Sequence, residues 1–311
     1  MATDPVPREV RFVSDEVELA GTMAVPDRGE VAHGVVMVGG SGASDRDNDT
    51  YFPPLRRHLV EAGIAVLSYD KRGVGSSTGE WRDATLDDLA GDALAALRFL
   101  RAQPGMRTGE VGLFGHSEGG WVVLRAAARA GAPWVITNSC PGMTPAAQDR
   151  HALANALRRS AATTRLAEGV LTWYDRLVDA GRNDLGFAEV ASLFDEAHPF
   201  TGFWGDMDER LWEFQKRKQD HDPVPDALRL RCPHLAIFGG ADELVPVADS
   251  VRLFGAAACH PDRDPRARLT VEVFPGADHR IRTNGGTSTA PGHLDTLTRW
   301  IKDRNSRLGP Q

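Results

Sequence analysis

Three residues whose side chains could act together in acyl transfer each follow a short apolar run, and the first of them is a serine. Ser117 is the centre of a Gly-x-Ser-x-Gly motif at residues 115–119, between the apolar run 111–114 and a stretch with Ala and Leu at helical spacing, 121–130. This order predicts a strand, a sharp turn and a helix. Only small neighbours fit such a strained turn, and the two glycines meet that need. The motif therefore predicts a serine hydroxyl held clear of the backbone.

An acid and a base for this serine occur later in the chain. Asp242 follows the apolar run 234–238 and two glycines, and His279 follows the run 269–274. Because open α/β sheets build their sites at the carboxyl ends of parallel strands, we expect both side chains at one edge of a sheet. His279 is the one histidine of ten that directly follows a predicted strand. The three residues could form a nucleophile, a base and an orienting acid.

Two neighbouring residues bear on these assignments. Glu243 is adjacent to Asp242 and competes with it for the role of the acid. His116 lies inside the turn beside the serine, where we expect its side chain to point away from the hydroxyl. Neither is the preferred residue.

A glycine-rich loop, residues 39–42, follows another apolar run, 33–38. An acyl-transfer site needs amide donors that point at a developing oxyanion, and glycine lets the backbone approach a substrate closely. The alternative is a phosphate-binding turn. Neither residues 40–45 nor the second glycine-rich stretch, 73–78, completes a Gly-x-Gly-x-x-Gly pattern, so nucleotide binding is disfavoured.

The elements around these motifs predict an α/β protein. Residues 9–25 alternate in polarity around a polar turn, which predicts an antiparallel hairpin at a sheet edge. Apolar runs and helical patterns then alternate, and Thr85 opens one helix with a pattern close to a capping box. Such alternation requires a mostly parallel sheet flanked by helices.

This alternation stops between about residue 141 and residue 225. The segment predicts three helices, at 145–167, 171–180 and 207–218. It also holds nine aromatic residues, which could wall a substrate pocket or pack the segment's own small core. They are Trp173, Tyr174, Phe187, Phe194, Phe200, Phe203, Trp204, Trp212 and Phe214.

The motif around Ser117 resembles the nucleophile elbow of the α/β-hydrolase superfamily, and the order Ser117, Asp242, His279 is characteristic of it. The resemblance implies a hydrolase core at residues 1–140 and 226–311 and an inserted helical cap at 141–225. Within the superfamily, the pattern Gly-x-x-Asp-x-x-Val-Pro favours Asp242 over its neighbour as the acid.

The resemblance also implies backbone donors for the oxyanion, which by position are the amides of Ser41 and Glu118. It is closest to esterase-like hydrolases with Gly-Ser-Gly followed by Asp-Arg-Asp, here at residues 45–47, where the charged pair braces the oxyanion loop. A second family-like turn implies that Asp70 and Arg72 form a bracing ion pair.

The implied activity is that of a serine hydrolase that cleaves carboxylic esters of small to medium, largely apolar substrates through an acyl-enzyme. A serine aminopeptidase or amidase, a thioesterase and a non-catalytic small-molecule binding protein of the same fold are alternatives. No cofactor and no metal are expected. Residues 45–49 begin like a calcium loop, but Thr50 and Arg56 replace its required glycine and glutamate.

Composition limits the partners. With 36 basic and 43 acidic side chains the formal charge is −7, which disfavours nucleic acid. The amino terminus has no signal-like apolar run, and no later run is long enough to cross a bilayer, so a cytoplasmic protein without membrane contact is expected. Three cysteines without a Cys-x-x-Cys pair favour reduced thiols. The oligomeric state stays open, with a homodimer as one alternative.

Overall fold

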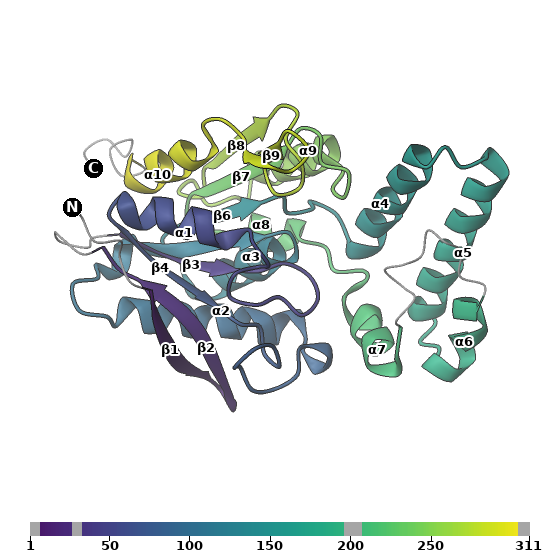
Figure 1. The fold of residues 1–311 in the computed structure, drawn as a ribbon, viewed down its shortest axis with the longest axis horizontal. Helices are drawn as coiled ribbons and strands as arrows, with labels where there is room; N and C mark the ends of the chain where they lie inside the picture. The colour runs from purple at the N-terminus through teal and green to yellow at the C-terminus, as the bar shows by residue number, and fades with distance from the viewer. Residues whose placement is uncertain (1–6, 27–32, 196–206, 304–311) are drawn as a thin grey trace.

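A central eight-stranded sheet organises the protein in the computed structural model, which describes residues 7–26, 33–195 and 207–303 (Figure 1). The strand order is β1-β2-β4-β3-β5-β6-β7-β8. The predicted hairpin, β1 and β2, is antiparallel and pairs with β4, and the strands from β4 to β8 are parallel. The strands are β1 (Arg8–Ser14), β2 (Val17–Ala24), β3 (His33–Val38), β4 (Ile64–Tyr69), β5 (Val111–His116), β6 (Val135–Asn138), β7 (His234–Gly239) and β8 (Leu269–Phe274).

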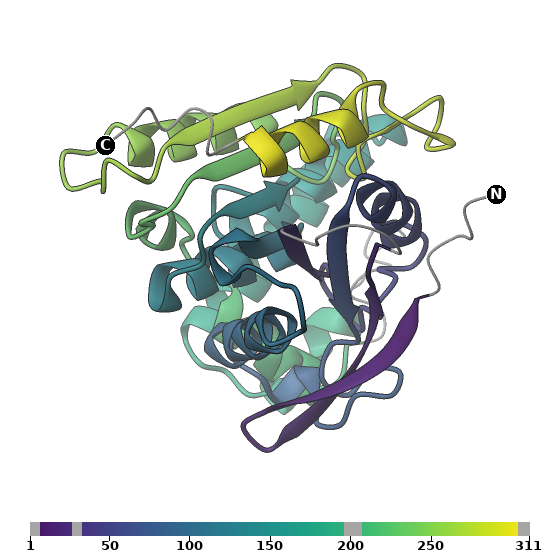
Figure 2. The ribbon, with the colours of Figure 1, turned by 90° about the vertical axis from the view of Figure 1, so that its left-hand side faces the viewer.

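Helices cover both faces of this sheet, which confirms the predicted α/β class (Figure 2). Side chains of β3 alternate between the two faces: Val36 packs with α2 and α3, whereas Val35 packs with α1 and α10. Since both faces are buried, the parallel strands are apolar almost throughout. The helices of this body are α1 (Phe52–Glu61), α2 (Leu86–Arg101), α3 (Glu118–Ala130), α8 (Val224–Leu228), α9 (Val247–Ala258) and α10 (His293–Asp303).

The start of α2 has the capping box that its sequence predicts. The Thr85 hydroxyl accepts a hydrogen bond of 3.1 Å from the Asp88 amide, and the Thr85 amide donates one of 2.8 Å to the Asp88 carboxylate. A cap of this kind stabilises a helix by about 1 kcal/mol. It fixes where α2 begins before the chain returns to β5.

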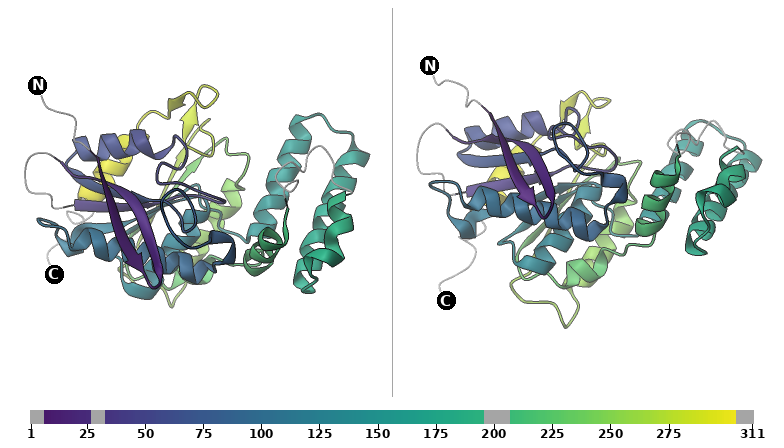
Figure 3. Two further views of the ribbon diagram at one scale, coloured as in Figure 1. Left: turned by 60° about the horizontal axis from the view of Figure 1, so that its bottom comes forward. Right: turned by 90° about the horizontal axis from the view of Figure 1, so that it is seen from below.

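Four further helices lie at one side of the sheet, between β6 and β7 in the chain (Figure 3). They are α4 (Pro145–Arg159), α5 (Thr164–Arg182), α6 (Phe187–Asp195) and α7 (Glu209–Lys218). The prediction of a single helix at 145–167 is wrong, because α4 ends at Arg159 and α5 begins at Thr164. The chain turns at Ala161, whose φ is 52°, and the Thr163 side chain caps α5 by accepting a hydrogen bond from the Leu166 amide.

The described aromatic residues of these helices mostly pack with one another. Rings of Trp173, Tyr174 and Trp212 are buried in a cluster between α4, α5, α6 and α7. Phe214 instead contacts the Trp81 ring of the sheet body, with ring centres 5.1 Å apart. Phe200, Phe203 and Trp204 lie outside the described residues. The cluster gives the four helices a small core of their own.

The ion pair expected between Asp70 and Arg72 does not form, because each residue has another partner. Arg46 of the Asp-Arg-Asp segment contacts Asp70 at 2.7 Å, and Arg72 contacts Asp92 of α2 at 2.7 Å. The glycine-rich turn after β4 wraps around the Asp70 carboxylate, which accepts a hydrogen bond from the Ser76 amide. Arg46 therefore joins the loop after β3 to the loop after β4.

Candidate active site

Ser117 occupies a strained turn between β5 and α3. Its φ is 55° and its ψ is −122°, a conformation that costs free energy for a residue other than glycine. The flanking glycines permit the turn, since a Cβ at Gly115 would lie 2.1 Å from the Gly119 carbonyl oxygen and one at Gly119 would lie 2.4 Å from the Val38 carbonyl oxygen. The sequence thus sets the serine at the carboxyl edge of the sheet, beside the start of α3.

His279 and Asp242 meet at the same edge. The His279 Nδ1 atom lies 2.8 Å from Asp242 Oδ2, and Asp242 Oδ1 accepts hydrogen bonds from the amides of Leu244 and Val245. The Asp242 side chain is fully buried, so its orientation is fixed. Glu243 forms an ion pair with Arg159 instead. Of the two adjacent acids, Asp242 is therefore the one that contacts the histidine.

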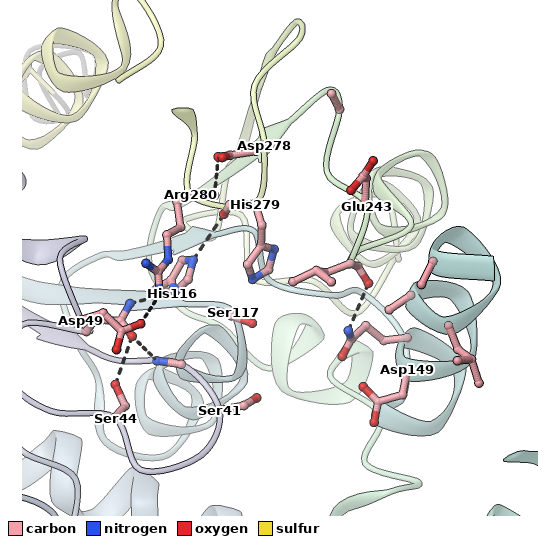
Figure 4. A pocket seen from close by; sticks show the side chains of 18 of the residues that line it. Ser41, Ser44, Asp49, His116, Ser117, Asp149, Glu243, Asp278, His279 and Arg280 are labelled. Carbon is pink, nitrogen blue, oxygen red and sulfur yellow. Dashed lines mark hydrogen bonds and ion pairs between the residues drawn. The ribbon is translucent and has the colours of Figure 1, made fainter. Parts of the chain in front are cut away.

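Ser117 and His279 line the same cavity of about 700 Å³, and Figure 4 shows the imidazole and the serine side chain facing it. Within the described ranges no hydrogen bond joins the Ser117 hydroxyl to the His279 ring. Hydrogen bonds between a nucleophile and its base commonly tighten only when substrate binds. The three predicted side chains thus meet at one edge of the sheet. The hydrogen bond between the Ser117 hydroxyl and the His279 ring would form when substrate binds.

The loop after β3 faces Ser117 across this cavity. The Gly40 amide donates to Asn48 Oδ1 at 3.3 Å, and the Gly40 carbonyl oxygen accepts from Lys71 Nζ at 2.7 Å. In the part of the chain that the structure describes, neither the Ser41 amide nor the Glu118 amide donates to a protein group. Glu118 is the first residue of α3, where amides lack helical partners. Both predicted oxyanion donors are thus available.

The Glu118 side chain holds a buried ionic cluster behind these amides. Its carboxylate contacts Lys71 at 2.9 Å and Lys218 of α7 at 2.7 Å, and it is only 1% exposed. Burial would raise the pKa of Glu118, but the two lysines lower it to about 2. The cluster fastens α7 to the residue that begins α3.

The His116 ring lies beside the His279 ring and lines the cavity, and its two ring nitrogens contact groups other than the Ser117 hydroxyl. Burial lowers its pKa well below the usual range, so the ring is neutral. Its Nδ1 atom lies 2.9 Å from the side-chain nitrogen, Nδ2, of Asn48, and its Nε2 atom lies 3.3 Å from the His279 carbonyl oxygen. In the matching tautomer, Nδ1 accepts from Asn48 and Nε2 donates to His279.

Asn48 thereby ties the loop after β3 to the end of β5, since its oxygen holds the Gly40 amide of its own loop while its side-chain nitrogen holds His116. Nothing in the local sequence marks Asn48 for the contact with His116, because that partner is distant in the chain. Among the described residues no cluster of three His, Cys, Asp or Glu side chains could hold a metal ion.

The fold is of the α/β-hydrolase type, and comparison with known proteins agrees. A model of the "Alpha/beta hydrolase family" matches residues 33–284. The chain therefore belongs to the alpha/beta hydrolase family. Within the described ranges no helix combines the length and apolar character that a membrane span requires.

Three similar proteins illustrate the relationship. Esterase EstD of Thermotoga maritima is 25% identical over 297 residues, which cover 91% of this chain and 65% of EstD, so the chain spans less than two thirds of that relative. A non-heme haloperoxidase of Rhodococcus erythropolis is 27% identical over 244 residues, 72% of this chain and 79% of its own length. The structure of a Pyrococcus furiosus esterase superposes with a TM-score of 0.58 at 19% identity, covering 98% of this chain and 90% of the esterase.

Proposed function

We propose that the protein hydrolyses carboxylic esters through an acyl-enzyme on Ser117. The observation that carries this proposal is the 2.8 Å contact between His279 and Asp242, with the histidine ring facing the cavity that Ser117 lines. A carboxylate on Nδ1 leaves Nε2 free to accept a proton. The named esterase relative supports ester bonds as the substrate class.

In the first half-reaction, His279 Nε2 accepts the Ser117 proton while the serine oxygen attacks the substrate carbonyl carbon. The Ser41 and Glu118 amides stabilise the oxyanion of the tetrahedral intermediate. The intermediate then collapses, the ester carbon–oxygen bond breaks, and His279 returns the proton to the departing alcohol.

In the second half-reaction, water takes the place of the alcohol. His279 accepts a proton from water as it attacks the acyl carbon, and the serine oxygen leaves with that proton. The products are a carboxylic acid and the regenerated enzyme. The four helices α4 to α7 act as a cap that encloses the acyl group, with α4 as the wall of the cavity.

Turnover of p-nitrophenyl acetate and butyrate tests this function. We expect Ser117→Ala and His279→Ala to lower kcat by at least about 10⁴-fold, and Ser117→Ala to abolish labelling by a fluorophosphonate. Ser76→Ala and His260→Ala, at exposed positions outside the cavity, are matched controls that should keep the wild-type rate. Turnover that survives both active-site substitutions would refute the mechanism, and a wild type inert to esters, thioesters and fluorophosphonate would indicate a binding protein.

A further inference from the structure

Among the described residues, the charged side chains that line the cavity each contact an opposite charge or accept hydrogen bonds, with one exception. Arg280 pairs with Asp49, and Arg159 of α4 pairs with Glu243. The Asp278 carboxylate accepts hydrogen bonds of 2.9 Å and 2.8 Å from two backbone amides of its own loop. These groups have their charge or hydrogen-bonding capacity satisfied within the protein.

Asp149 is the exception. It lies on the face of α4 that walls the cavity, and Figure 4 shows its carboxylate on the cap side, across the cavity from Ser41 and Ser117. In the structure as described, 33–195 and 207–303 included, the Asp149 side chain accepts no hydrogen bond and forms no ion pair. The residue is half-buried, and the cavity is the open space beside it.

The neighbours of Asp149 are already engaged. Lys218 of α7 is a cation close enough to lower the pKa of Asp149. Its ammonium group, however, donates a hydrogen bond to Glu118 of α3 at 2.7 Å. The hydroxyl of Tyr174, on α5, donates to the Ala146 carbonyl oxygen at 3.0 Å. Both of these neighbours therefore direct a hydrogen bond to a group other than Asp149.

A carboxylate in this position is costly to ionise. Burial raises the pKa of Asp149 to about 6, although Lys218 lowers it and Glu118 raises it further. Above that pH the group is charged and poorly solvated, and a charge of this kind is stabilised by an opposite charge nearby. The charge of the whole cavity also favours a cation, because four carboxylates and two guanidinium groups line it.

We propose that Asp149 forms a subsite for a positively charged nitrogen, so that the preferred esters carry an ammonium or a quaternary ammonium group. This inference rests on the proposed ester hydrolysis and names the substrate class of the same site. The cation lies against α4 while the ester carbonyl lies at Ser117. An ionic contact replaces the water that solvates Asp149 in the cavity.

Two matched substrate pairs test the subsite. The first is acetylthiocholine and its uncharged isostere, in which carbon replaces the quaternary nitrogen, so the charge lies on the leaving group. The second is the p-nitrophenyl ester of a trimethylammonio-butanoic acid and its carbon isostere, which places the charge on the acyl group. The measurement is the ratio of kcat/KM for the charged ester to kcat/KM for its isostere.

We expect a ratio of about tenfold for at least one pair in the wild type. Asp149→Asn should lower that ratio to about one, and Asp149→Glu should retain most of the preference. Glu168→Gln, which removes an exposed charge from α5, is the matched control and should leave the ratio unchanged. Thermal unfolding of each variant verifies that it folds.

The same ratio gives a pH test. Below pH about 6 Asp149 binds a proton and the preference should disappear, whereas it should be complete above that pH. Any effect of pH on the hydrolytic steps that the two esters of a pair share slows both equally, so it cancels in the ratio. The quaternary nitrogen does not titrate, which leaves the protein as the source of any change.

The outcomes separate this inference from the proposed function. A wild-type ratio of about one for both pairs, with both esters hydrolysed, would overturn the subsite alone, as would a preference that Asp149→Asn retains. If no ester is hydrolysed, the proposed function fails. Calorimetry then measures the affinity of Ser117→Ala for each of the four esters. Equal affinity for the charged and the neutral ester of each pair would overturn the subsite.

Discussion

The two walls of the cavity differ in how completely their polar groups are satisfied. On the sheet side, Asp242 uses both carboxylate oxygens and His116 uses both ring nitrogens in hydrogen bonds. On the cap side, α4 presents apolar residues, the engaged side chains of Gln148 and Arg159, and Asp149, which has no hydrogen-bond or ion-pair partner among the described residues. A saturated wall holds catalytic groups in one geometry, while an unsaturated wall leaves affinity for a ligand. The difference supports our proposals that the sheet edge carries out the chemistry and that the cap selects the substrate.

The largest effect should come from disturbing the saturated wall at its acid. Asp242→Asn keeps the shape of the side chain but replaces the charged carboxylate with a neutral amide. The amide no longer holds the proton on His279 Nδ1, so the tautomer is wrong for catalysis. We expect kcat to fall by about 10⁴-fold with little change in KM, measured by steady-state kinetics. Glu243→Gln is the control and should change kcat by less than about threefold; a large loss there would reassign the acid.

A smaller effect, on stability, is expected at the contact between Lys218 of α7 and Glu118 of α3, which joins the cap to the sheet side. Lys218→Met leaves the buried Glu118 carboxylate with Lys71 alone, and removing one partner of a buried ionic group costs about 3–5 kcal/mol. The free energy of unfolding in urea measures the loss. Removing the whole cluster, with Lys71→Met and Glu118→Gln added to Lys218→Met, should recover most of it because no buried charge is then left unpaired, and no recovery would argue against the ionic cluster.

The ionic cluster also predicts acid sensitivity. The folded-state pKa of Glu118 is about 2, below the ordinary value of 4.5 for an unfolded glutamate. The stabilisation from its ionised form is therefore complete above pH about 4.5 and is lost as the pH falls towards 2. Urea unfolding between these pH values should show a steeper loss of stability in the wild type than in Glu118→Gln; equal slopes would contradict the assignment.

Next in size is the effect of breaking the contact between the loop after β3 and the end of β5. Asn48→Asp tolerates the residue's positive φ of 46° but removes the amide donor to His116. We expect the His116 pKa to rise and kcat to fall about tenfold, or ~1.4 kcal/mol. Proton NMR of the histidine ring together with kcat checks both. An unchanged ring titration with unchanged kcat would assign Asn48 no role beyond the turn.

The smallest effect is expected on the outer surface of the cap. Arg150 and Asp175 form a close ion pair, but about half of each side chain is exposed. Pairs of this kind contribute about 0–1 kcal/mol. Arg150→Ala should therefore lower the free energy of unfolding by no more than about 1 kcal/mol, and a loss of several kcal/mol would show that the cap depends on its surface charges.

Sequence patterns predicted those features that depend on residues close together in the chain. The buried strands, the capping box at Thr85 and the turn at Ser117 each have a local pattern, and the common edge of parallel strands then places Asp242 and His279. The break between α4 and α5 had a local signal in Thr163, a good helix cap, which the Ala-rich surroundings obscured.

Features that depend on distant partners were not predictable in this way. Arg46 and Arg72 each had an acidic neighbour in sequence, yet their partners in the fold are Asp70 and Asp92. Lys218 ends a basic run typical of a solvated helix terminus, and only the packing of α7 against α3 makes it a buried partner of Glu118. Which of several polar side chains becomes buried is set by tertiary structure.

One residue, Glu118, serves two structures at once. Its backbone belongs to the turn that presents the serine, and its side chain is the anchor for α7. A protein engineer who grafts a different set of helices onto this sheet must therefore supply a cation where Lys218 stands. Without it, the graft would leave the buried Glu118 carboxylate with one of its two cationic partners missing, one residue from Ser117.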